Sequence, residues 1–171
     1  EYVFLIDDDL VYPADFVART ISEFGSLGEG KYFGGYHGSL YVRPGFSLKP
    51  RRFWRWLTYT ESKVAGFRRR IQVHEAVDEP LVMDQIATNA AIIRGPDMPP
   101  YEFMADSQKF VDVRLARWNF EHGIIPVVLP RPAGWIGHVR FEDTIYRSFT
   151  SKDLPHVAAE IMSYAFKVEG R

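Results

Sequence analysis

The chain has 171 residues, of which 46% are hydrophobic and 25% charged, a composition typical of a folded domain and unlike that of a disordered or fibrous chain. Its formal net charge of -1 provides no overall attraction to nucleic acid, which we therefore do not expect as a partner. The sequence contains no cysteine, which excludes disulfides, thiol nucleophiles and zinc–thiolate sites and favours a reducing compartment.

The sequence carries no segment that would direct the chain into or across a membrane. No apolar run approaches the roughly 20 residues of a membrane span, and the first residues lack the basic, apolar and small-residue order of a signal peptide. The chain begins with Glu1 rather than Met, and we interpret it as a piece of a longer protein. We expect a single domain over residues 1–171 in the cytoplasm, with a peripheral contact at the inner face of the membrane left open.

The chain opens with a short apolar run, Tyr2 to Ile6, that is rich in β-branched and aromatic residues and ends at Asp7 to Asp9. This pattern predicts a strand buried on both faces, with three carboxylates at its carboxyl end. Pro13 suits the first turn of a helix, and apolar residues recur at helical spacing from Phe16 until Gly25. The strand, the acidic turn and the helix make half of a βαβ unit.

Glycines interrupt the next segment. Residues 32–36 and 39–42 read as two strands or a hairpin around Gly34, Gly35 and Gly38, where we expect close approach of the backbone to a neighbour.

The stretch from Arg51 to Trp56 is both basic and aromatic. It predicts an amphipathic surface helix with Phe53, Trp54 and Leu57 facing the core. The alternative is contact with an anionic acceptor, a lipid-linked carrier or a membrane face, because Arg and Trp suit such interfaces. The basic run from Arg68 to Arg70 predicts a solvated corner rather than a phosphate clamp.

The second half of the chain alternates strand and helix patterns. A helix over 107–122 is predicted from its apolar spacing, with Gly123 just past its end. The remaining expected elements are strands at 71–73, 87–93 and 124–129, a loop or short strand at 135–141, and a closing amphipathic helix at 157–168.

Three consecutive carboxylates at the end of a buried strand repel one another unless cations or hydrogen-bond donors compensate. Side chains alternate along an extended segment, so Asp7 and Asp9 can face one divalent ion. Asp8 would then turn toward the backbone, a ribose hydroxyl of a donor, or the next helix. Oxygen ligands favour Mg²⁺ or Mn²⁺ over zinc. The alternative is that these acids only cap the following helix, although one Asp suffices for a cap.

The run from Phe4 to Phe16 resembles the strand, DxD motif and following helix of GT-A-fold glycosyltransferases, in particular the large inverting group, family 2-like, that is related to bacterial cell-surface polysaccharide enzymes. The resemblance implies a three-layer α/β/α mixed sheet. It also implies that Asp7 and Asp9 hold a divalent ion bridging the two phosphates of a nucleotide-sugar, and that Asp8 lies on the donor side.

A second segment, Phe103 to Ala116 followed by Gly123, is similar to the part of that family in which an acidic residue opens a helix beside the acceptor site. Asp112 takes the place of this residue and would be the catalytic base. Val111 stands where the family often has Glu, so Asp106 remains a competitor for the base and is otherwise expected to bind the acceptor.

Many members of the family place a histidine after this helix and strand as a further metal ligand. His138 fits that order, with a purely structural histidine as the alternative. Trp135 would supply a wall on which an acceptor sugar stacks, or else a partly buried core indole. The family's β-α-β segment that binds the nucleotide base would lie upstream of Glu1, so the chain would be the C-terminal portion of such a domain and lack the first nucleotide-binding strands.

The expected function is therefore Mn²⁺- or Mg²⁺-dependent transfer of a sugar from a nucleotide-sugar donor to a glycan or polysaccharide acceptor, with inversion expected and retention left open. One alternative is a phosphatase of the haloacid dehalogenase type, because Asp7 to Val11 also matches DxDx[TV]. That family needs a downstream Lys and a paired-acid motif, and neither is clear in the sequence. The other is a non-catalytic carbohydrate-binding remnant of the fold.

Overall fold

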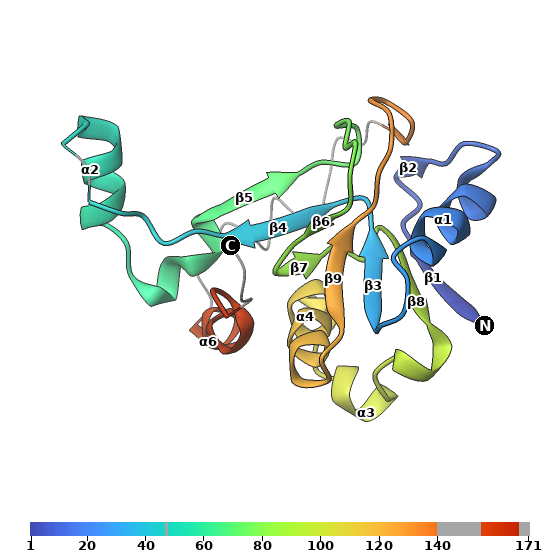
Figure 1. Cartoon of the computed structure of the whole chain (residues 1–171). Helices are drawn as coiled ribbons and strands as arrows, with labels where there is room; N and C mark the ends of the chain where they lie inside the picture. The colour runs from blue at the N-terminus through green and yellow to red at the C-terminus, as the bar shows by residue number, and fades with distance from the viewer. Residues whose placement is uncertain (47, 140–154, 168–171) are drawn as a thin grey trace.

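The computed structural model describes residues 1–46, 48–139 and 155–167 and has a mixed α/β architecture, as predicted (Figure 1). The strands are β1 (Tyr2–Ile6), β2 (Leu10–Val11), β3 (Tyr32–Gly35), β4 (Gly38–Tyr41), β5 (Arg68–Ile71), β6 (Leu81–Val82), β7 (Gln85–Ile86), β8 (Ala90–Arg94), β9 (Ile125–Val128) and β10 (Gly137–His138). The helices are α1 (Phe16–Gly25), α2 (Pro50–Leu57), α3 (Tyr101–Met104), α4 (Val111–Glu121) and α6 (Pro155–Tyr164), with 3₁₀ turns η1 (Glu61–Gly66) and η2 (Gly95–Asp97).

The principal sheet has five strands in the order β1-β8-β3-β9-β6. Strand β8 runs antiparallel to both β1 and β3, whereas β3 and β9 are parallel. A second sheet has the order β5-β4-β7, and β2 pairs with β10. The predicted strands at 32–36 and 39–42 therefore do not form a hairpin, because β3 and β4 belong to different sheets.

Helices cover both faces of the principal sheet. Ala91 and Ile93 of β8 pack in one apolar cluster with Leu115 of α4, whereas Ala90 and Ile92 pack in another with residues of α1. This alternation follows from the two-residue period of a strand. It explains why β8 is an uninterrupted apolar run, and it places α1 and α4 on opposite sides of the sheet.

Strand β1 forms where it was predicted, but it is not buried on both faces. Its ends are exposed, with Tyr2 at 37% and Ile6 at 60% of their accessible surface. The reason is its position: β1 lies at the edge of the sheet and, within the described residues, pairs only with β8.

The close backbone approach predicted at the glycines is confirmed. A Cβ atom at Gly35 would lie 2.3 Å from Cγ2 of Ile86, and one at Gly34 would lie 2.7 Å from the ring of Phe24. At Gly38 it would lie 2.5 Å from a methyl group of Val128. Gly34 and Gly35 let α1 and β7 pack directly on β3, and Gly38 lets β4 approach β9.

The C-terminal helices also form. Helix α4 begins at Val111, later than predicted, and Gly123 just past its end has a φ of 66°. Helix α6 covers most of the predicted closing helix, although Val168 lies outside the described residues, as do residues 140 and 141 of the predicted strand. The hydroxyls of Tyr41 and Tyr164 both donate to Oε1 of Gln85, which ties α6 to the second sheet.

Helix α2 contradicts the predicted orientation of the basic aromatic stretch. It forms over the expected residues, but none of them is buried, and Trp54 and Leu57 are 61% and 53% exposed instead of facing the core. The run from Arg68 to Arg70 is not a corner either, because it belongs to β5 and pairs with β4. None of the described helices is long and apolar enough to cross a membrane.

The packing at Gly35 can be tested by substitution. Gly35→Ala should lower the free energy of unfolding by about 1–3 kcal/mol, because the added methyl group overlaps Ile86 in a closely packed core. Gly25→Ala is the matched control, since a Cβ there meets no atom within 4 Å. Urea denaturation measures both variants, and equal stability of Gly35→Ala and the unchanged protein would contradict this account.

Candidate active site

The acidic turn after β1 is held against the start of β8. The backbone N–H of Asp7 donates to the carbonyl of Asn89 at 3.1 Å. The hydroxyl of Tyr12 donates to the same carbonyl at 2.6 Å and accepts a hydrogen bond from the N–H of Asp7 at 3.0 Å. These hydrogen bonds therefore fix the backbone at Asp7, where the acidic turn begins.

These carboxylates do not cap the following helix. Helix α1 starts at Phe16, with Asp15 in the N-cap position, several residues beyond the acidic turn. This arrangement removes the alternative in which Asp7 to Asp9 serve only as a helix cap. At the end of this edge strand Asp7 and Asp8 are exposed, whereas Asp9 is half-buried.

Helix α4 brings a fourth carboxylate to this place. The pKa of Asp7 is raised, first by partial desolvation and then by the charges of Asp9, Asp112 and Asp8, in that order. Asp112 lies in the first turn of α4, far along the chain from the others. The fold thus joins the two acidic motifs that the sequence indicated separately, and Asp112 rather than Asp106 is the distant carboxylate whose charge acts on Asp7.

Asp112 is held in one orientation by Thr88. Its Oδ1 accepts hydrogen bonds from the backbone N–H and the hydroxyl of Thr88, both at 2.9 Å. Its Oδ2 accepts no hydrogen bond from the described residues. Burial raises the pKa of Asp112, and this effect outweighs the opposing effects of the Thr88 hydrogen bonds and of the Arg68 charge. One oxygen is therefore fixed while the other is left to take a proton.

Asp9 has a buried oxygen without a partner. Its Oδ1 is shielded from solvent and has no hydrogen-bond donor within the described residues, while its backbone carbonyl accepts from the N–H of Val139 at 2.8 Å. An unsatisfied buried carboxylate oxygen costs free energy, and a cation would remove that cost.

His138 comes close to this turn in the fold. Strand β10 pairs His138 with Leu10, the residue after Asp9, and the imidazole is exposed. Its ring centre lies 6.2 Å from that of His74. Within the described residues, however, no group of three His, Asp or Glu side chains is arranged to hold a metal ion.

Asp7 and Asp9 nevertheless fit a divalent ion. Mg²⁺ is commonly held by one or two carboxylates, with water and substrate phosphate oxygens completing its coordination, so a preformed set of three protein ligands is not required. Two carboxylate ligands without their ion are expected to show an unsatisfied oxygen and mutual repulsion. Asp9 has such an oxygen, and neighbouring negative charges help to raise the pKa of Asp7. His138 stays a predicted third ligand.

Two of the predicted residues make no contact that tests their roles. Asp8 is exposed, and so is Asp106, which lies in the turn between α3 and α4. Neither forms an ion pair or side-chain hydrogen bond with the described residues. Donor binding by Asp8 and acceptor binding by Asp106 stay predictions.

Trp135 packs as part of the α1 cluster. Its indole N–H donates to Oδ1 of Asp15 at 3.3 Å, and its ring lies 5.2 Å from that of Tyr36 and 5.9 Å from that of Phe16. The guanidinium of Arg19 lies 4.9 Å from the ring centre. A sugar that stacked on the face beneath Arg19 would have to displace that side chain, so the acceptor role stays a prediction.

The sequence did not single out Tyr12, Thr88, Asn89 or His37, which complete the site. Nδ1 of His37 lies 3.5 Å from Nδ2 of Asn89, and burial together with nearby arginines lowers the pKa of His37 to about 4, which keeps it neutral at pH 7. Thr88 and Asn89 directly precede the apolar run of β8. In the sequence, their position at the start of a strand is the one feature that distinguishes Thr88 and Asn89. The local sequence does not indicate that this strand pairs with β1.

Comparison of the whole sequence with protein-family models gives no match, and comparison with curated proteins gives no relative.

Metal binding by the acidic turn is testable in the chain as it stands. Mn²⁺ should raise the Tm of the unchanged protein, and Asp7→Asn or Asp9→Asn should remove most of that rise, because each loses a carboxylate ligand. Differential scanning fluorimetry measures the shift, and Asp106→Asn is the matched control that should keep it. An Asp9→Asn variant with an unaltered Mn²⁺ response would rule out Asp9 as a ligand.

Asp7→Asn should have the opposite effect without metal. In EDTA at neutral pH, this variant should be more stable than the unchanged protein, because it removes a carboxylate whose pKa is raised by partial desolvation and by neighbouring carboxylates. A raised carboxyl pKa means that the folded state binds a proton more readily, so this difference should shrink as the pH falls through the carboxyl range. A gain that grows toward acidic pH would contradict the repulsion at Asp7.

Proposed function

We propose that this chain carries the metal and acceptor residues of a glycosyltransferase that moves a sugar from a nucleotide-sugar to a hydroxyl of a glycan or polysaccharide. The observation that carries the proposal is that Asp112 is hydrogen-bonded to Thr88, while the next residue, Asn89, accepts from the N–H of Asp7 at the start of the acidic turn. Asp112 acts electrostatically on Asp7, has one oxygen held by Thr88 and has the other without a described donor. A cation site beside an oriented carboxylate is the pairing that such a transfer needs.

Asp7 and Asp9 would hold the ion, Mn²⁺ or Mg²⁺. When bound, the ion would neutralise the charge that develops on the phosphate oxygen of the departing nucleoside diphosphate. The unpartnered oxygen of Asp9 supports this assignment. Asp8, in the same turn, would face a hydroxyl of the donor, and His138 would be a further ligand of the ion.

Asp112 would take the proton of the acceptor hydroxyl as that oxygen attacks the anomeric carbon. Its raised pKa favours proton uptake, since burial disfavours the charged carboxylate. The two Thr88 hydrogen bonds hold Oδ1 of Asp112, which restricts the orientation of the carboxylate and so the position of its second oxygen. Direct attack assisted by one base gives inversion of configuration, which is the outcome we propose.

The GT-A fold is part of this proposal, and two features support it. Helices α1 and α4 lie on opposite faces of the principal sheet, as in a three-layer α/β/α arrangement. The outer edge of β1 pairs with no described strand, which leaves backbone groups able to accept another strand. The nucleotide-binding strands expected upstream would pair along this edge.

The role of Asp112 can be separated from donor binding. In a chain extended upstream, Asp112→Asn should slow transfer by about 10²–10⁴-fold, the usual contribution of a general base, while the affinity for the donor stays unchanged. Thr88→Ala should lower kcat less and leave the donor affinity intact, because Thr88 only positions Asp112. Release of nucleoside diphosphate reports the rate, and Asp78→Asn, at an exposed position with no proposed role in the site, is the control. Normal turnover in Asp112→Asn would shift the base to Asp106 or elsewhere.

Donor binding itself tests the proposed domain boundary. Calorimetry with a panel of nucleotide-sugars should detect Mn²⁺-dependent binding by a chain extended upstream by about a hundred residues, and little binding by this chain alone. Adding Asp7→Asn to the extended chain should abolish that binding. If neither chain binds any donor with Mn²⁺ present, the transferase proposal fails, and a phosphatase assay or a glycan-binding screen becomes the next experiment.

A further inference from the structure

Helix α2 and the segment before it, residues 42–46 and 48–57, form an arm that extends to the side of the molecule away from the principal sheet (Figure 1). We call this segment the α2 arm. Its large apolar side chains face solvent instead of the core. They are Phe46 at 62%, Leu48 at 86%, Trp54 at 61%, Trp56 at 41% and Leu57 at 53% of their accessible surface. A group of exposed rings and aliphatic chains on one segment marks an interaction surface.

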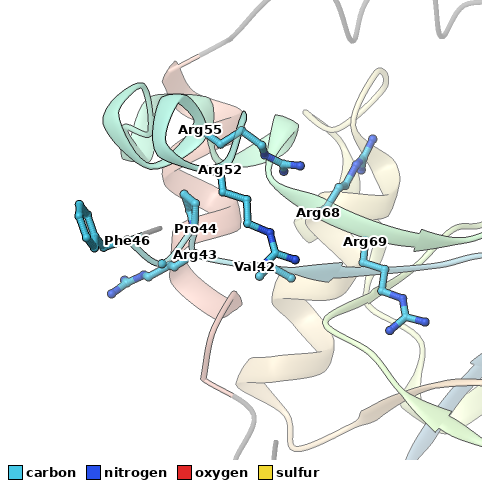
Figure 2. Close-up of a pocket in the computed structure, with 9 residues that line it drawn as sticks. Val42, Arg43, Pro44, Phe46, Arg52, Arg55, Arg68 and Arg69 are labelled. Atoms are coloured by element: carbon cyan, nitrogen blue, oxygen red, sulfur yellow. The ribbon is translucent and has the colours of Figure 1, made fainter. Parts of the chain in front are cut away.

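A cavity of about 460 Å³ lies between the α2 arm and β5, and arginines line it. Figure 2 shows Arg52 and Arg55 directed from α2 toward the side of the cavity where Arg68 stands on β5. Arg43 and Arg69 complete the set, and Phe46 also lines the cavity. The sequence indicated these basic residues as two separate runs, and the fold places both around one space.

Within the described part of the chain none of the five arginines forms an ion pair with a carboxylate, although the charge of Arg68 acts on Asp112. Arg43 lies 4.7 Å from the ring centre of Phe166, and Arg55 lies 5.4 Å from that of Phe67, so these two guanidiniums rest on aromatic faces. Like charges gathered around one cavity repel, and a bound anion relieves that repulsion. The planar fork of donors on Arg matches the oxygens of a phosphate group.

The two faces of α2 have opposite chemistry. At the helical period, Phe53, Trp54 and Leu57 share one side, while Arg52 and Arg55 lie on the other. Arg52 and Arg55 line the cavity, whereas Trp54 and Leu57 are exposed on the opposite side, which is the reverse of the usual arrangement on a protein surface. We therefore expect an anion to bind on the side of α2 that carries Arg52 and Arg55, and an apolar medium to cover the side that carries Trp54 and Leu57.

Both needs are met together at the surface of an anionic bilayer. Interfacial helices insert an apolar face into the boundary between headgroups and acyl chains and keep basic residues at the phosphates, and Trp favours that depth. A soluble anion would satisfy the arginines and leave the rings in water. A second copy of the chain could cover the rings, but it would bring another arginine-rich arm close to the first.

We propose that the α2 arm docks on an anionic membrane surface, where Phe46, Trp54 and Leu57 enter the interfacial layer and the arginine cavity binds lipid phosphate. This inference is independent of the proposed glycosyl transfer, since it uses none of the carboxylates of the candidate active site.

Vesicle sedimentation of the full chain tests the docking. The protein should bind vesicles of equimolar phosphatidylglycerol and phosphatidylcholine but not vesicles of phosphatidylcholine alone, and binding should weaken with salt. Arg52→Glu combined with Arg55→Glu should reduce binding to the level of neutral vesicles. Lys31→Glu combined with Lys109→Glu is the matched control, because these exposed residues lie outside the arm and the change in net charge is the same.

The apolar face has a separate readout. Binding to anionic vesicles should shift tryptophan emission to the blue, and Trp54→Ser combined with Leu57→Ser should reduce both the shift and the bound fraction. All four substituted arm positions are exposed, so thermal unfolding of the variants should match that of the unchanged chain.

Three results would overturn the proposal. The first is equal binding of the chain to both kinds of vesicle or to neither. The second is an equal loss of binding in the lysine control and the arginine variant, which would indicate a general charge effect. The third is calorimetric binding of inorganic pyrophosphate without any binding to anionic vesicles, which would assign the cavity to a soluble phosphate ligand.

Discussion

The antiparallel pairing of β1 with β8 is the constraint on which the candidate site depends. It ends where the N–H of Asp7 meets the carbonyl of Asn89, and the Tyr12 hydroxyl closes the same junction. Because Thr88 is the next residue back along the chain, the register that fixes Asp7 also fixes the donor that orients Asp112. One set of backbone hydrogen bonds thus positions both the acidic turn, which would hold the ion, and Asp112, the proposed base. A shift of the strand register by one residue would turn every side chain of β1 to the other face of the sheet.

Charge is distributed unevenly in this protein although its net value is only -1. Carboxylates gather at the end of β1 and the start of α4, and arginines gather around the cavity beside α2. Arg68 belongs to both regions, since it lines the cavity and its charge acts on Asp112. Each cluster carries an electrostatic cost in the free protein, and each cost would be removed by a ligand of opposite sign. Neither cluster is explained by the packing of the core.

Local patterns predicted most of the elements. Strand β1, helix α1, strand β9 and the helix that ends before Gly123 all follow from apolar spacing and from residues that start or stop a helix. The errors share one cause. The outward face of α2, the edge position of β1 and the pairing of the Arg68 to Arg70 run with β4 all depend on which distant segment lies alongside, and apolar spacing shows only that a face exists.

By itself the sequence determined the α/β class and indicated the acidic turn as a cation candidate, because those inferences need only local periodicity and the chemistry of residue types. Asp112 was indicated only by the family resemblance, which left Asp106 as an alternative. Only the tertiary structure decided that the charge of Asp112 acts on Asp7, that Thr88 holds Asp112 while Asn89 holds the backbone of Asp7, and that residues of the two basic runs line one cavity. The physical reason is that strand pairing and helix packing are contacts between residues far apart in the chain. Such contacts are set by the burial of the whole core, and no single segment encodes them.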